Sequence, residues 1–221
     1  MATFSPLVEL RQYTLRPGTR DTLIELFDRE FVETQEAVGM KIIGQFRDLD
    51  DPNRFVWLRG FRDMGARAAS LKAFYEEGLA WKTHRASARA TMVDTNDALL
   101  LHPARTTSGF ALDGARRTTA PPKSLVTATL HYFATPPTAE HSAHFEAAIQ
   151  PVLARAGATV LASFVTDASP NTYLPLPLRQ GEHAFVWFAH YEDHAVPLPP
   201  LPAWGRAQVL RLAPTARSLL R

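Results

Sequence analysis

The stretch 50-DDPNRFVWLRGFRD-63 decides the fold, because a turn signal is followed by an alternating run of large apolar residues. The stretch 169-SPNTYLPLPLRQGEHAFVWFAHYED-193 has the same order, with an insertion in its middle. Each pattern is typical of a hairpin turn that leads into a strand. The sequence therefore predicts that one structural unit occurs twice.

A constant offset supports the internal repeat. Gly157 lies 118 residues after Gly39, and the spacing grows to 130 between Trp57 and Trp187, so the second hairpin carries a 12-residue insertion. One offset and one insertion align both halves, which is the signature of a duplicated unit.

Periodicity predicts a β-α-β-β-α-β unit in the first copy. The expected strands are 7–15, 40–46, 54–61 and 97–104, and the expected helices are 19–38 and 66–93, the latter interrupted at Gly78. The second copy has expected strands at 125–133, 158–164, 185–191 and 207–214 and a helix at 140–156, with a proline-rich segment in place of the second helix. We therefore expect an α+β protein with domains at 1–104 and 124–221, a linker at 105–123, and a degenerate second copy.

Composition limits the classes of function. Apolar residues make up 46% and charged residues 21% of the 221 residues, as in a globular protein with a proper core. The net charge is only +2 and the basic residues are scattered, which argues against a nucleic-acid or membrane partner. The chain has no cysteine, no basic leader and no apolar run of membrane-spanning length, so we expect a cytoplasmic protein.

Several segments of the first copy resemble one known family. The segments "VELRQYTLRPGT", "GMKIIGQF", "NRFVWLRGFRD" and "AWKTH" are similar to the NIPSNAP family, well over 7–104 and more weakly over 125–193. The resemblance implies ferredoxin-like domains of the dimeric α-β barrel type, in which two four-stranded sheets enclose a barrel. It implies no settled biochemical activity. With both copies on one chain, the expected fold is a tandem pseudo-dimer, and further homodimerisation stays open.

Strand alternation predicts which residues face the enclosed space. The aliphatic row with Val56 and Leu58 suits packing under helices, so the bulkier row with Trp57 and Arg59 is expected to point into the barrel. An offset of 119 makes Ala128, Leu130 and Tyr132 of the second copy the predicted equivalents of Glu9, Arg11 and Tyr13 on the first strand. The predicted ligand-binding residues are Glu9, Arg11, Tyr13, Trp57, Arg59, Tyr132, Trp187 and Tyr191.

Three functions remain open for this half-polar, half-aromatic lining. It is typical of a pocket for a small aromatic or apolar ligand. Alternatively, the arginines could stabilise an enolate or phenolate in a cofactor-independent monooxygenase or isomerase. The third possibility is a protein-interaction module without a ligand, in which the charges only tie the sheets together.

No cofactor or metal site is expected. His141 and His144 share a helix face, but no third ligand stands at a recognisable spacing. An RNA-recognition module has the same order of elements, yet "GEHAFVWF" matches only the end of its third-strand pattern. The common nucleotide-binding and hydrolase motifs are missing as well.

Overall fold

The computed structural model describes residues 5–112, 116 and 120–221 of the chain. The strands of the first half are β1 (Leu7–Leu15), β2 (Lys41–Asp48), β3 (Arg54–Phe61) and β4 (Met92–Pro103). Those of the second half are β5 (Leu125–Tyr132), β6 (Thr159–Thr166), β7 (Ala184–Tyr191) and β8 (Arg206–Pro214). These bounds confirm the predicted strands to within two residues at every end except the start of β4.

Strand β4 begins at Met92, in a stretch predicted to be the end of a helix and a loop. Its first residues pair with β1, in the register Leu15 opposite Met92 and Thr14 opposite Asp94. Backbone hydrogen bonds to the neighbouring strand stabilise this polar segment. Such bonds do not require alternating apolar residues, so the sequence pattern did not indicate a strand here.

The helices follow the predicted segments. They are α1 (Arg20–Leu26), α2 (Val32–Glu36), α3 (Met64–Lys72), α4 (Leu79–Thr91), α5 (Ala139–His144) and α6 (Gln150–Arg155). A π-helical turn, 27–31, joins α1 to α2, and similar turns follow α3 and α5. Gly39 and Gly157 end α2 and α6 with φ of 94° and 80°, a conformation that glycine adopts without strain. Gly78 interrupts the predicted long helix, in an extended conformation.

All eight strands form one closed antiparallel barrel, in the order β1-β3-β2-β8-β5-β7-β6-β4. Within each half the sheet order is therefore the same, with the last strand beside the first. The two halves join where β2 pairs with β8 and where β4 pairs with β6. Closure leaves no sheet edge exposed.

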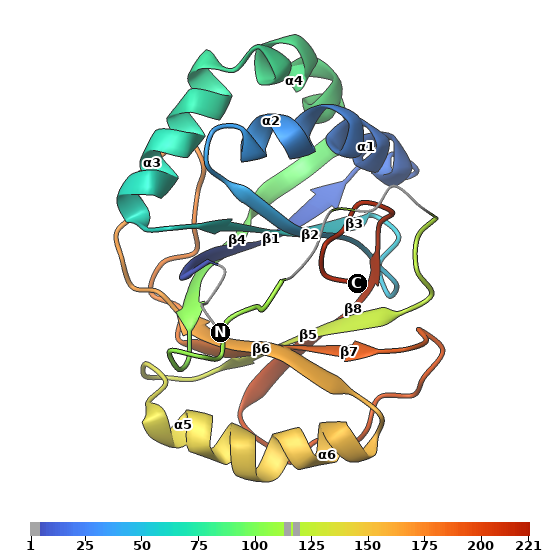
Figure 1. The fold of residues 1–221 in the computed structure, drawn as a ribbon, viewed down its shortest axis with the longest axis vertical. Helices are drawn as coiled ribbons and strands as arrows, with labels where there is room; N and C mark the ends of the chain where they lie inside the picture. Colours follow the sequence, from blue (N-terminus) through green and yellow to red (C-terminus); the bar gives the residue numbers. More distant parts are fainter. Residues whose placement is uncertain (1–4, 113–115, 117–119) are drawn as a thin grey trace.

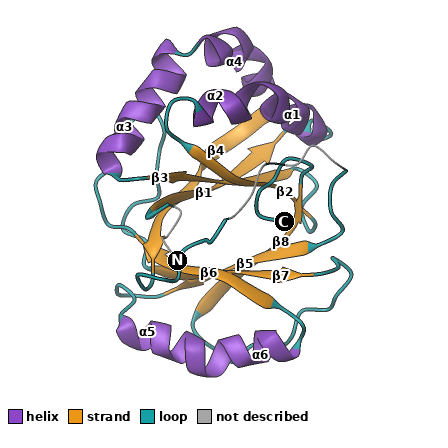
Figure 2. Ribbon diagram, viewed as in Figure 1, coloured by secondary structure: helices purple, strands orange, loops and turns teal. Residues whose placement is uncertain are grey.

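Helices cover the barrel on two opposite sides. Helices α1 to α4 lie over the strands of the first half, and α5 and α6 lie over those of the second half (Figures 1 and 2). Each half thus has an outer sheet face packed under helices and an inner face toward the barrel axis. Among the described residues, no helix is long and apolar enough to span a membrane.

The barrel interior is filled by aliphatic and aromatic side chains from both halves. Val56 and Leu58 of β3 belong to this interior core, together with Val186 and Phe188 of β7. The bulkier row of β3, including Trp57, instead packs under the helices of the first half. The predicted facing was wrong, because an eight-stranded barrel is only wide enough for side chains to interdigitate. Trp57 and Trp187, the largest fully buried side chains among the described residues, both pack under helices.

The predicted offset of the first strand of the second copy was also wrong, by one residue. Glu9 pairs with Arg59 on β3, and the residue that pairs with Ala189 on β7 is Thr127, which is 118 positions after Glu9. A slip of one residue moves every side chain to the other face. Tyr132 lies on the barrel side, as predicted, but it is not the counterpart of Tyr13, which packs under the helices.

The predicted linker contributes to the core. Phe110 is buried in the barrel interior, with its ring 5.0 Å from that of Phe164 and 5.1 Å from that of Phe188. A single aromatic residue in an aperiodic segment gives no sequence signal of burial. The positions 113–115 and 117–119 of this segment lie outside the described residues.

Candidate functional site

Glu9 on β1 lies at the centre of a fully buried ionic cluster. Its Oε2 is 3.1 Å from Nη1 of Arg11 and 2.7 Å from Nη2 of Arg59. Its Oε1 is 2.6 Å from Nε of Arg67, which comes from α3. Alternation on β1 and pairing with β3 place the first three residues on one face, and α3 brings the third arginine over them.

The cluster carries more positive than negative charge. Three guanidinium groups surround a single carboxylate, and all four side chains are without solvent exposure. Burial alone would raise the pKa of Glu9, but the charges of Arg59, Arg11 and Arg67 outweigh it and hold this pKa far below its usual range. The three arginines share this one carboxylate, so the cluster has a surplus of two positive charges in a region of low dielectric constant.

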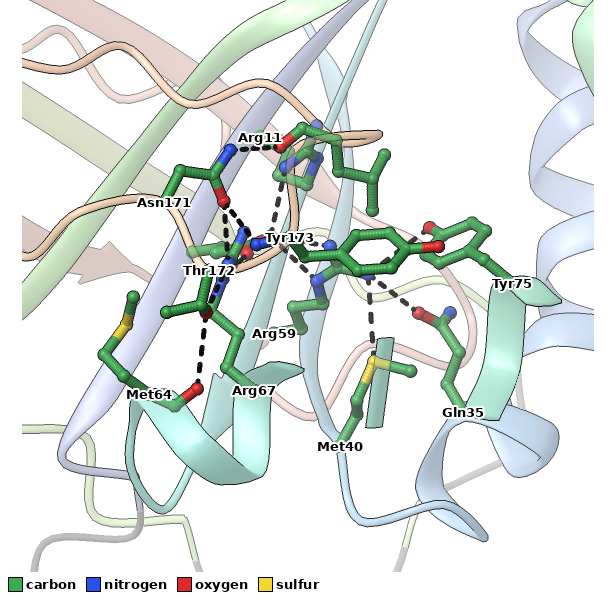
Figure 3. A network of polar contacts seen from close by, with 12 residues as sticks. Arg11, Gln35, Met40, Arg59, Met64, Arg67, Tyr75, Asn171, Thr172 and Tyr173 are labelled. Atoms are coloured by element: carbon green, nitrogen blue, oxygen red, sulfur yellow. Dashed lines mark hydrogen bonds and ion pairs between the residues drawn. The ribbon is translucent and has the colours of Figure 1, made fainter. Parts of the chain in front are cut away.

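Neutral polar groups accept several of the other guanidinium N–H bonds. Arg11 donates to the hydroxyl of Tyr13 at 3.3 Å and to the carbonyl of Thr95 at 3.1 Å. Arg59 donates to the amide oxygen of Gln35 and to the hydroxyl of Tyr75, both at 3.3 Å (Figure 3).

Arg67 reaches the second half of the chain. Its Nη1 donates to Oδ1 of Asn171 at 3.0 Å and to Oγ1 of Thr172 at 3.4 Å. Both acceptors lie in the loop between β6 and β7, which holds the inserted residues. Nη2 of Arg67 and Nε1 of Trp57 are buried without a hydrogen-bond partner.

A cavity of about 450 Å³ lies next to this cluster, between the helices and the outer sheet face of the first half. We call it the first-half cavity. Its polar lining includes groups that contact the arginines, and its apolar lining is mainly aromatic. Lining residues include Tyr13, Gln35, Tyr75, Thr95, Trp57, Trp81 and Phe31.

Two features of the lining set its chemistry. Burial raises the pKa of Tyr75 despite the nearby Arg59, so its hydroxyl keeps the hydrogen that it can donate to a ligand. Arg85 and Arg89 from α4 add positive charge to the lining, and Asp94 adds one negative charge.

The inserted loop between β6 and β7 closes part of the cavity. Tyr173, Pro175 and Leu176 of this loop line it, and the ring of Tyr173 stacks against that of Tyr75 at 6.3 Å. Burial and the carboxylate of Glu76 raise the pKa of Tyr173 to about 12. A segment of the second half thus covers a site of the first half.

The structure brings together five of the eight predicted ligand-binding residues. Tyr13 and Trp57 line the first-half cavity, and Glu9, Arg11 and Arg59 form the cluster behind it. The structure does not bring the other three to this cavity: Trp187 and Tyr191 lie under the helices of the second half, and Tyr132 lies on the barrel side.

The histidines considered for metal binding have structural contacts instead. Nδ1 of His141 accepts from the backbone N–H of Thr138 at 3.0 Å and so caps α5. The ring of His144 lies 5.0 Å from that of Trp204. Across the described parts of the chain, no three His, Asp or Glu side chains gather in a way that could hold a metal ion.

Arg67 and Tyr75 were missed as site residues. Arg67 lies four residues before Leu71, on the face of α3 that is buried against the sheet. An arginine in the apolar stripe of a predicted helix is the signal that could have identified it. Tyr75 gave no such signal, since an aromatic residue at this period is normally part of the core.

Comparisons with known proteins agree with this fold. The whole chain is similar to the crystal structure of a "putative monooxygenase" from Lactobacillus acidophilus NCFM, with a TM-score of 0.55 and 12% identity over 95% of this chain and 94% of that one. A second "putative monooxygenase", from Fusobacterium nucleatum, is similar with a TM-score of 0.53 and 9% identity, over 96% of this chain and 93% of that one. Both matches show a shared fold.

Similarity to a protein family was found for the first half of the chain. An uncharacterised NIPSNAP-like domain protein from Burkholderia xenovorans is 29% identical, with a TM-score of 0.40, over 44% of this chain and 84% of its own. No curated protein matches the sequence. The NIPSNAP family model matches residues 8–107, the segment that holds the ionic cluster and most of the cavity lining. Through residues 8–107, this chain is similar to the NIPSNAP family.

Proposed function

We propose that the protein binds a small aromatic ligand with one acidic group in the first-half cavity. The observation that carries this proposal is the surplus of two buried positive charges directly behind the cavity wall. A carboxylate or phenolate placed there interacts favourably with these charges. The ligand then lies between sheet and helices, and not in the space between the two sheets that the sequence suggested.

The hydroxyls of Tyr13 and Tyr75 are the proposed contacts to the acidic group. Each accepts a hydrogen bond from an arginine, at 3.3 Å in both cases, and each can donate its own hydrogen to an anion. Polarisation by the guanidinium strengthens such a donor, since chained hydrogen bonds reinforce one another. The orphan Nε1 of Trp57 is a further donor in the same wall.

The aromatic lining favours a flat ligand. The ring of Trp57 packs edge-on against Phe27 at 4.9 Å, and the ring of Trp81 lies 4.9 Å from that of Tyr75. A volume of about 450 Å³ lies within the usual range for small-molecule pockets. A two-ring or three-ring aromatic acid is therefore the proposed ligand class.

A matched ligand pair tests the charge requirement. We expect 2-naphthoate to bind at least tenfold more tightly than its neutral methyl ester, because only the acid gains from the arginines. Fluorine NMR of 5-fluorotryptophan-labelled protein identifies the site: resonances of Trp57 and Trp81 should shift, and those of Trp187 and Trp204 should not. Equal affinity for the acid and the ester, or shifts of the Trp187 and Trp204 resonances alone, would contradict the proposal.

A variant pair tests the named contacts. Tyr75→Phe should weaken 2-naphthoate binding about tenfold, which corresponds to the loss of one hydrogen bond to a charged group. Tyr191→Phe in the second half is the matched control and should leave the affinity unchanged. An unchanged affinity in Tyr75→Phe would show that this hydroxyl does not contact the acid.

Cofactor-independent oxygenation is the second candidate function. The arginine-backed hydroxyls that would hold a carboxylate would also stabilise the enolate of an aromatic ketone. Dioxygen would then insert one atom as a carbonyl while the other leaves as water with two substrate hydrogens. Anthrone is a suitable probe: oxygen uptake and anthraquinone formation above the uncatalysed rate, lost in Tyr75→Phe, would support this activity. A rate equal to the uncatalysed one argues for a binding protein.

We also propose that the two halves are diverged tandem copies of a ferredoxin-like domain, at 1–104 and 124–221, which form a pseudo-dimer. Equal sheet orders and the matching helix ends at Gly39 and Gly157 support this proposal. A cytoplasmic location and the formation of a homodimer remain proposals of the same kind. Size-exclusion chromatography with light scattering tests the dimer.

A further inference from the structure

A second cavity, of about 300 Å³, lies under the proline-rich segment of the second half. We call it the second-half cavity. It is bounded by the outer face of β5 and β8, by α6, and by residues 198–205. Its lining residues include Thr127, Thr129, His131, Tyr191, Trp204 and Val209, and none of its lining residues carries a formal charge apart from the titratable His131.

This lining differs in charge from that of the first-half cavity. Strand pairing places Thr127 and Ala189 where the first half has Glu9 and Arg59. Likewise Thr129 and His131 stand at the positions of Arg11 and Tyr13, opposite Trp187 and Phe185. The ionic cluster is thus replaced by two hydroxyl groups, a methyl group and an imidazole.

The hydrogen bonding of His131 defines what the cavity offers. Its Nδ1 lies 2.5 Å from the carbonyl oxygen of Trp204, so Nδ1 carries the hydrogen and donates it. Burial lowers the pKa of His131, although the bond to that carbonyl opposes the shift, and the ring is neutral at pH 7. Nε2 is then an acceptor, and it is buried without a hydrogen-bond partner.

The imidazole is held in place by aromatic rings. It stacks on Trp187 with a centroid distance of 5.1 Å and an angle of 15°, and the ring of Trp204 lies 5.2 Å away. The residue as a whole is only 4% exposed. His131 lines the cavity, and its fixed, unpaired acceptor is costly unless a ligand supplies the donor.

We propose that the second-half cavity binds a neutral aromatic compound whose single hydroxyl donates to Nε2 of His131. An anion is disfavoured, because no cationic group lines the cavity. A metal ion is disfavoured as well, since His131 would be its only strong ligand. The two cavities of this chain thus take ligands of different charge.

A neutral ligand pair tests the proposal on the whole protein. We expect 2-naphthol to bind at least fivefold more tightly than 2-methoxynaphthalene, which has the same rings but no hydroxyl hydrogen. In 5-fluorotryptophan-labelled protein, 2-naphthol should shift the resonances of Trp187 and Trp204. Equal affinities, or shifts only of Trp57 and Trp81, overturn the proposal. Since 2-naphthoate reports on the other pair of tryptophans, failure of one site leaves the test of the other intact.

A variant then tests the acceptor itself. His131→Phe should bind both compounds with equal affinity, because the ring remains while the acceptor is lost. His194→Phe is the matched control, because His194 is exposed and does not line the cavity, and this variant should retain the preference for 2-naphthol. If His131→Phe does not fold, the nitrogen-15 chemical shift of Nε2 in the unmodified protein is measured instead. We expect this shift to change when 2-naphthol is added and to stay constant when 2-methoxynaphthalene is added. The opposite result refutes the contact.

Discussion

Replacing Glu9 by glutamine tests whether the ionic cluster is truly desolvated. The substitution keeps the shape of the side chain and removes the only negative charge among three fully buried arginines. We expect a large loss in the free energy of unfolding, because three guanidinium groups are left without an ionic partner.

The magnitude follows from the geometry. At an effective dielectric constant of about 20, one such contact contributes about 4 kcal/mol of Coulomb attraction, and Glu9 makes three. Desolvation and repulsion among the arginines offset most of this sum. Removing one partner of a buried pair costs roughly 3–5 kcal/mol, and we expect the upper end, about 5 kcal/mol, which is comparable to the whole stability of a small domain.

Urea unfolding at pH 7 measures this loss. The matched control is Glu146→Gln, which removes a carboxylate from an exposed pair with Arg105 and should cost less than about 1 kcal/mol. If Glu9→Gln is too unstable to purify, Glu9→Gln with Arg67→Met should regain about 2 kcal/mol by removing one surplus charge. A cost below about 1 kcal/mol for Glu9→Gln would refute the buried cluster.

The pH dependence gives an independent check. The pKa of Glu9 is lowered in the folded protein, so its contribution to stability is present above the ordinary value of 4.5 and is lost as the pH falls below it. The Glu9→Gln variant should lack this part of the acid destabilisation. Parallel stability curves of both proteins between pH 5 and pH 3 would contradict the assignment.

Two further predictions concern a half-buried carboxylate and the barrel interior. Burial raises the pKa of Asp28 to about 6, despite the nearby Arg217 and Arg116. Because the folded protein binds this proton more tightly than the unfolded chain does, its contribution to stability is present at low pH and is lost as the pH rises to that value. Asp28→Asn should therefore be more stable than the unmodified protein at pH 7.5, by roughly 1–2 kcal/mol after allowance for partial exposure. If the unfolding free energies of the two proteins change with pH by the same slope between pH 4.5 and 7, this prediction is contradicted. Phe188→Ala should cost about 3–5 kcal/mol in urea unfolding, because the side chain is fully buried in the barrel, whereas a cost under about 1 kcal/mol would indicate an open interior.

Local patterns in the sequence were sufficient for the elements and their order. Strand β1 (Leu7–Leu15) and strand β3 (Arg54–Phe61) have the predicted bounds, because each alternates between apolar faces and ends at a turn signal. Gly39 and Gly157 end their helices as predicted, since their positive φ is a local property. Such features depend only on residues near in the chain.

The candidate site could be predicted only in part. The grouping of Glu9, Arg11 and Arg59 was correct, since alternation places them on one face, but both faces of these strands are buried. Hydrophobicity therefore could not decide which of them faces the barrel. Which face points into the barrel depends on the width of the closed barrel, and the sequence of a single strand does not indicate this width. The contacts of Arg67 with the distant β6–β7 loop depend on how the halves meet.

The loop between β6 and β7 has a consequence for how the two halves depend on each other. It belongs to the second half, yet it supplies Tyr173 and Leu176 to the first-half cavity, and Arg179 pairs with Asp97 of β4 at 3.0 Å. The half that provides the charges is therefore not the half that closes over them. A ligand in this cavity would bind only when both halves are folded and joined, so its binding energy would strengthen the cooperativity of the entire chain.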